Sequence, residues 1–153
     1  MRLSKKLEYA IRALIYMASK GRGRTFLIRD IASNNEIPKK FLELILLDLK
    51  NAGILTSKRG VSGGYAFLRD PSEITLLEVF RAIEGELDPT ECMREMKEKC
   101  EGQADPSWCA LKAVMEDMKR TVEEMLSRWT IEKIVALEKE LKARSAENLM
   151  FYI

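Results

Sequence analysis

The chain of 153 residues contains no histidine and only three cysteines. Without histidine there is no imidazole base to activate a cysteine or serine nucleophile. No glycine-rich phosphate loop and no paired-carboxylate cleft is recognisable in the sequence either. We therefore expect that the protein is not an enzyme.

Long apolar runs are also missing. No stretch approaches the roughly 18 residues that span a bilayer, and the N-terminal residues lead into an amphipathic pattern instead of a signal peptide. We expect a cytoplasmic protein without membrane contact. In that reducing compartment an odd number of cysteines favours metal binding or redox sensing over a disulfide framework.

Positive charge is concentrated in the first half of the chain. Residues 1–72 carry 14 Lys/Arg against 6 Asp/Glu, a balance of +8, whereas residues 73–153 carry 12 against 18, a balance of −6. The two balances together give the net charge of +2. A basic surface attracts the phosphate backbone of nucleic acid, and the alternative is an ordinary solvated charged surface.

Periodicity and turn residues predict a mainly α-helical fold with a small β-hairpin. The expected helices span about 4–20, 27–32, 38–53 and 75–85, and the expected strands are 54–57 and 65–68. Apolar spacing predicts that the first helix buries Leu7, Ala10, Ile11, Leu14, Ile15 and Ala18, and that the third buries Phe41, Leu42, Ile45, Leu46 and Leu49. Two short helices joined by a tight turn and followed by a basic hairpin are typical of a winged helix-turn-helix.

The rest of the chain predicts an appended dimerisation region. Apolar residues recur with three-and-four spacing after Cys109, and this half has no other large core, so we expect a second copy of the chain to cover them. The expected segments are a winged helix-turn-helix DNA-binding domain at 1–72, a connecting helix at 73–85, a cysteine-bearing sensor loop at 86–109, a long dimerisation helix at 110–129 and a C-terminal helix and tail at 130–153.

Charged residues lie where such a fold meets DNA. Lys39, Lys40 and Glu43 lie on the solvent side at the start of the third helix. Glu43 could accept a hydrogen bond from a cytosine amino group, and the lysines suit phosphates or guanine. Arg59 at the wing tip suits a narrow minor groove. Each of these residues could also be an ordinary surface charge.

Several segments resemble the IscR/NsrR family of bacterial winged-helix repressors. They are Met1-Arg2-Leu3-Ser4, Tyr9-Ala10, residues 37–43, Ala52-Gly53 and residues 59–65, and the resemblance covers residues 1 to about 140. It implies a homodimer that binds palindromic double-stranded operator DNA through the third helix and the wing. The contact residues that we expect on this basis are Arg2, Lys39, Lys40, Phe41, Glu43, Lys58, Arg59 and Gly60.

All three cysteines, Cys92, Cys100 and Cys109, lie in the expected sensor loop. Thiolates are soft ligands that suit iron-sulfur clusters, zinc or copper. The resemblance implies an iron-sulfur cluster, 2Fe-2S rather than 4Fe-4S, although the cysteine intervals here are longer than is usual in the family. Histidine cannot be the fourth ligand, and Glu8 of the partner subunit matches the carboxylate that nitric oxide sensors of the family use.

The sequence therefore predicts a DNA-binding transcriptional regulator, a repressor, whose cluster senses redox state, nitric oxide or cluster supply. The alternative is a cluster-free winged-helix regulator that responds to thiol oxidation, zinc or a small ligand. Acid-labile sulfide distinguishes the two interpretations.

Overall fold

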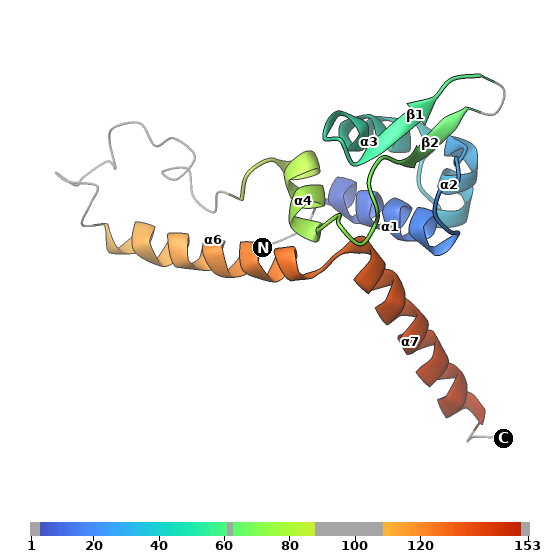
Figure 1. Cartoon of the computed structure of the whole chain (residues 1–153). Helices are drawn as coiled ribbons and strands as arrows, with labels where there is room; N and C mark the ends of the chain where they lie inside the picture. Colours follow the sequence, from blue (N-terminus) through green and yellow to red (C-terminus); the bar gives the residue numbers. More distant parts are fainter. Residues whose placement is uncertain (1–3, 61–62, 88–108, 151–153) are drawn as a thin grey trace.

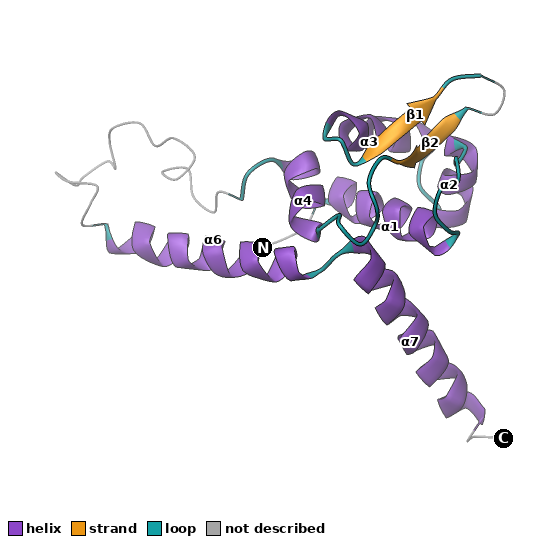
Figure 2. Cartoon of the chain, viewed as in Figure 1, coloured by secondary structure: helices purple, strands orange, loops and turns teal. Residues whose placement is uncertain are grey.

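The computed structural model describes residues 4–60, 63–87 and 109–150, the last five of these by their backbone alone (Figures 1 and 2). Its elements, in chain order, are α1 (Lys5–Ser19), α2 (Ile28–Asn35), α3 (Lys39–Asn51), β1 (Leu55–Lys58), β2 (Gly64–Phe67), α4 (Leu76–Glu84), α6 (Ala110–Arg128) and α7 (Ile131–Met150). The predicted fold class, mainly helical with a two-stranded wing, is confirmed (Figure 2). Cys92, Cys100 and most of the predicted sensor loop lie outside the described residues.

One hydrophobic core holds α1 to α4 and the start of α7 together. The residues that α1 buries are Leu7, Ala10, Ala13, Leu14 and Met17. The predicted face was partly wrong, because Ile11, Ile15 and Ala18 are only partly buried. Helix α1 packs against α2, α3, α4 and α7, and these neighbours together place the centre of its buried face at Ala10, Leu14 and Met17.

The turn between α2 and α3 is closed by backbone and side-chain hydrogen bonds. Glu36 takes the left-handed conformation at φ 55°, which lets the Ile37 N–H reach the Ala32 carbonyl at 3.0 Å. Arg12 of α1 donates to the Asn35 carbonyl at 2.6 Å. The sequence predicted Pro38 as the first helical residue, but Pro38 is the N-cap of α3 and the helix begins one residue later, at Lys39. The turn therefore fixes α3 relative to both α1 and α2.

The wing is an antiparallel hairpin anchored to the helical body. Leu55 pairs with Phe67 and Lys58 with Gly64. Tyr65 also exchanges two backbone hydrogen bonds with Phe26, at 2.8 and 2.9 Å. Phe26 lies just before α2, so this bridge sets the position of the wing beside the helix-turn-helix.

A joint connects the corner between α6 and α7 to the beginning of α4. The Leu76 N–H donates to the Trp129 carbonyl at 2.8 Å, and the Ile131 N–H donates to the Ile74 carbonyl at 3.0 Å. Ile74 and Ile131 are both fully buried. These contacts fix the start of α7 against the helical body that carries the wing.

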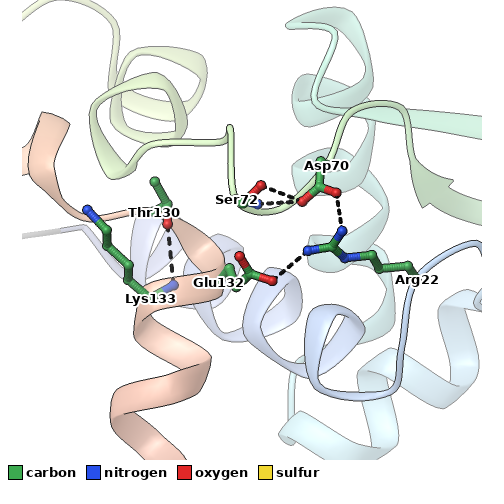
Figure 3. Close-up of polar contacts among 6 residues, drawn as sticks. All are labelled: Arg22, Asp70, Ser72, Thr130, Glu132 and Lys133. Carbon is green, nitrogen blue, oxygen red and sulfur yellow. Dashed lines mark hydrogen bonds and ion pairs between the residues drawn. The ribbon is translucent and has the colours of Figure 1, made fainter.

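Ion pairs reinforce this joint from outside, as Figure 3 shows. Arg22 binds Asp70 at 2.5 Å and Glu132 at 2.6 Å, and so bridges the segment after the wing and the first turn of α7. Hydrogen bonds from the hydroxyl and N–H of Ser72, together with the charge of Arg22, hold the pKa of Asp70 below its ordinary value. Asp70 is therefore ionised at neutral pH and available to Arg22.

Helix α4 begins with the predicted capping box, which is confirmed. Thr75 accepts a hydrogen bond from the Glu78 N–H at 3.2 Å, and Glu78 accepts one from the Thr75 N–H at 2.9 Å. Burial alone would raise the pKa of Glu78, but the hydrogen bonds from Thr75 and Arg69 hold this pKa below its ordinary value. Glu78 thereby joins the residue Arg69, just after the wing, to α4 through a 2.6 Å contact.

Helix α6 extends away from the body beside α4, and α7 leaves the corner in another direction (Figure 1). None of the side chains of α6 is buried. The exposed large apolar residues of α6 are Leu111, Val114, Met118 and Met125. In the parts of the chain that the structure describes, no helix is long and apolar enough to cross a membrane.

Candidate nucleic-acid interface

Helix α3 is seated on α1 by packing and by one ion pair. Its residues Leu42, Ile45, Leu46 and Leu49 are fully buried. The ring of Phe41 packs edge-on against Tyr9, with 5.9 Å between the ring centroids. Lys6 binds Asp48 at 2.7 Å. These contacts leave the opposite face of α3 open to solvent.

The first turns of α3 present the charged residues that the sequence singled out. Lys39, Lys40 and Glu43 are all exposed. Lys39 and Glu43 lie one turn apart, with 4.0 Å between the ammonium nitrogen and the nearer carboxylate oxygen. An exposed pair at this distance contributes little to stability, so Lys39 can exchange the contact for a phosphate or a base, and Glu43 can exchange it for a base amino group.

The wing completes a basic surface next to these residues. Lys58 ends β1, and Arg59 and Gly60 follow it, all exposed. A shallow groove of about 440 Å³ separates the wing from the helix-turn-helix. Its lining residues are Leu27, Ile28, Arg29, Lys39, Glu43, Lys58, Gly60, Gly63 and Gly64. Residues from three separate segments therefore meet on one face.

Of the predicted contact residues that the structure describes, Lys40, Phe41 and Arg59 do not line this groove. The structure does not describe Arg2. Phe41 is only half exposed and holds α3 against Tyr9 of α1, so a role for Phe41 at the interface would be to orient α3. Lys40 lies on the solvent face but does not line the groove, because it follows Lys39 by one residue on the helix.

Sequence reasoning missed Arg29, Leu44 and Leu47. Arg29 is 77% exposed and lines the groove from α2, and no spacing rule marked it. Leu44 and Leu47 are exposed on α3. The signal for them was present, since both are out of phase with the four buried positions of the same helix.

The candidate metal ligands are only partly described. Cys109 is the N-cap of α6, half exposed, and its sulfur accepts a hydrogen bond from the Lys112 N–H at 3.4 Å. Glu8 lies on the first turn of α1 and contacts Lys5 at 2.7 Å and Arg12 at 3.7 Å. The hydrogen bond from Lys5 is the main reason why the pKa of Glu8 lies below its ordinary value. Within residues 4–60, 63–87 and 109–150, no three such side chains form a metal-binding group.

Comparison with known proteins decides the family. The model of the Rrf2 family, described as an iron-dependent transcriptional regulator, matches residues 3–137. The chain belongs to the Rrf2 family. The predicted resemblance to IscR-type regulators is thereby confirmed, and this Rrf2 protein is a DNA-binding transcriptional regulator.

Its relatives agree over nearly the whole chain. It is 33% identical to the rrf2-like HTH-type transcriptional regulator of Rhodobacter capsulatus, over 88% of this chain and 92% of the relative. Among solved structures it resembles CymR, the global cysteine regulator of B. subtilis, with a TM-score of 0.70, 27% identity and coverage of 90% and 98% of the two chains. It also resembles T. potens IscR, with a TM-score of 0.69, 25% identity and coverage of 94% and 90%. These relatives are regulators, which confirms that this Rrf2 protein is not an enzyme.

Proposed function

We propose that this Rrf2 protein is a homodimeric repressor that reads operator DNA with α3 and the wing, and that an iron-sulfur cluster controls its operator affinity. The proposed reading of DNA rests on the groove that Lys39 and Glu43 of α3 line together with Lys58 of the wing. A recognition helix in the major groove and a basic wing on the adjacent backbone would use these residues together.

The proposed dimer rests on α6. Leu111, Val114, Met118 and Met125 follow three-, four- and seven-residue steps, so they form one apolar stripe along the helix. Between 42% and 59% of each of these residues is exposed in the single chain. A second α6 packed on this stripe would bury it and place two recognition helices on successive major grooves.

The ligands proposed for the cluster are Cys92, Cys100 and Cys109, with Glu8 of the partner subunit as the fourth. The two proposed ligands that the structure describes, Cys109 and Glu8, are suited to binding a cluster. Cys109 already receives a backbone N–H donor, and such hydrogen bonds tune cluster thiolates. Glu8 is an exposed carboxylate whose lowered pKa keeps it ionised, as a ligand must be. A bound cluster supplies reversible redox chemistry and a centre that nitric oxide or oxygen can attack.

A chain of contacts links the head of α6 to the wing. Cys109 caps α6, and Glu123 on the same helix binds Arg81 of α4 at 3.0 Å. The first turn of α4 holds Arg69, which lies two residues after β2, through Glu78 at 2.6 Å. A change in the position of α6 would therefore reach the wing through α4.

Alanine at Arg59 tests the DNA-binding surface. We expect the parent protein to bind its operator at least about fivefold more tightly than R59A, because a charged wing contact is worth about 1–3 kcal/mol. The slope of log affinity against log salt should also fall by about one unit. Fluorescence anisotropy with an operator duplex selected from a random pool measures both quantities.

Lys142→Ala is the matched control, because it removes the same charge from the exposed surface of α7. It should bind the operator as the parent does. If R59A and K142A bound equally tightly, the wing assignment would be wrong.

Anaerobic purification tests the cluster. We expect visible absorption with iron and acid-labile sulfide in the parent protein, and loss of all three in C92A. E8A should retain part of the cluster and lose it faster in air, since three thiolates would remain. E138A, which removes an exposed carboxylate from α7, is the control and should match the parent.

A cluster-free regulator is the second candidate, favoured by the similarity to a structure described as a global cysteine regulator. In that case the parent would contain no acid-labile sulfide even after cluster reconstitution. The signal would then be thiol oxidation, a small ligand or zinc, and zinc would give metal without colour.

A further inference from the structure

Helix α3 carries two kinds of leucine. Leu42, Leu46 and Leu49 have no exposed surface, whereas Leu44 is 56% exposed and Leu47 is 44% exposed. Single exposed leucines are common on protein surfaces. Here two of them are neighbours on α3, the helix proposed to read DNA.

The period of the helix places these two leucines opposite the core. Leu44 lies one turn after Lys40, and Leu47 lies one turn after Glu43, since residues four apart are neighbours on a helix surface. Leu44 and Leu47 are three apart and are neighbours for the same reason. The face of α3 that would enter a major groove is therefore charged at its start and apolar in its middle.

A pair of apolar side chains in the major groove packs favourably against one base, thymine. The C5-methyl group of thymine is the apolar group that the major groove displays, and the other base edges offer hydrogen-bond donors and acceptors. A leucine side chain against such an edge would displace water without replacing its hydrogen bonds, which is unfavourable. Against a thymine methyl the same side chain gains burial.

We propose that Leu44 and Leu47 determine operator specificity by packing on thymine methyl groups in each half-site. This inference rests on the proposed DNA-reading role of α3. It adds that the middle of α3 selects thymine. The surrounding charge favours DNA over a protein as the occupant, because Lys39, Lys40 and Lys58 lie on the same side of the molecule.

Deoxyuracil provides a direct test, since it differs from thymine only by the methyl group. A duplex selected from a random pool with the full-length parent is resynthesised with each thymine in turn replaced by deoxyuracil. We expect about a fourfold loss of affinity at one or two thymines of each half-site, which corresponds to one buried methyl group. Substitutions at the other thymines should have no effect.

Alanine variants then assign the methyl groups to side chains. In L44A and L47A the affinity for the parent duplex should fall, and the corresponding deoxyuracil should cost nothing further. Both side chains are exposed, so the melting temperature should stay unchanged. L141A, which shortens a leucine of α7 that is 55% exposed, should retain the full deoxyuracil effect.

Two results would overturn the inference while leaving DNA binding intact. One is a parent protein that is indifferent to deoxyuracil at every position of its selected duplex. The other is a deoxyuracil effect of the same size in the parent, L44A and L47A. If the parent selects no duplex at all, the DNA-reading role of α3 fails, and this inference fails with it.

Discussion

Replacing Gly64 with alanine should displace the wing and weaken operator binding by at least about tenfold. A Cβ atom at this position would lie 2.3 Å from the Phe26 carbonyl oxygen and 2.8 Å from its carbon, and both are backbone atoms that cannot rotate away. The φ of 154° is also unfavourable for a residue with a side chain. The bridge between Phe26 and Tyr65 must therefore open. We expect a loss of about 2–3 kcal/mol of folding free energy, measured by thermal denaturation, together with the affinity loss measured by anisotropy.

Gly53→Ala separates the clash from backbone strain. Gly53 has φ 72° and open space where a Cβ would lie, so alanine there should cost only about 1 kcal/mol. The variant should leave the wing in place and operator affinity close to that of the parent. Equal losses of stability and of affinity in G53A and G64A would show that the close approach to Phe26 does not position the wing.

Glutamate at Met118 should dissociate the proposed dimer. Met118 lies in the middle of the apolar stripe of α6 and is 42% exposed in the single chain. In a two-fold symmetric interface the substitution occurs twice, and each new carboxylate would be buried without a partner. We expect the dimer dissociation constant to rise at least about 100-fold. Sedimentation velocity measures this constant, and binding to a two-half-site operator should fall in parallel.

Ala113→Glu is the control for charge on the same helix. Ala113 is exposed, and its position lies away from the stripe, because it follows Leu111 by two residues and not by three or four. A113E should remain a dimer at the concentrations where M118E is monomeric. A monomeric parent, or a dimeric M118E, would refute the α6 interface.

The sequence predicted the local elements of the DNA-binding domain well. The Thr75 and Glu78 spacing predicted the capping box, and Gly53 ends α3 in the left-handed conformation as expected. Such features depend on a few neighbouring residues, so they can be identified in the sequence. Cys92 and Cys100 fall outside the described residues, and their predicted role as ligands stays a prediction.

Features that depend on distant segments were not predicted. Several helices pack on α1 from different sides and together determine its buried face. The apolar spacing within α1 alone therefore could not predict that face. The bridge between Thr75 and Thr130 joins residues far apart in the chain. The exposure of Leu44 could have been predicted from its phase on α3. Arg29 could not have been predicted, since only the folded wing brings it into the groove.

The corner between α6 and α7 also bears on operator geometry. Backbone hydrogen bonds tie this corner to α4, and Arg22 ties the first turn of α7 to the segment after the wing. In the proposed dimer, the domain that reads DNA and the first turn of α7 would therefore move as one rigid unit. The distance between the two half-sites would then be set by α6 and by the way it crosses the α6 of the partner subunit. It would not depend on the bases that α3 selects.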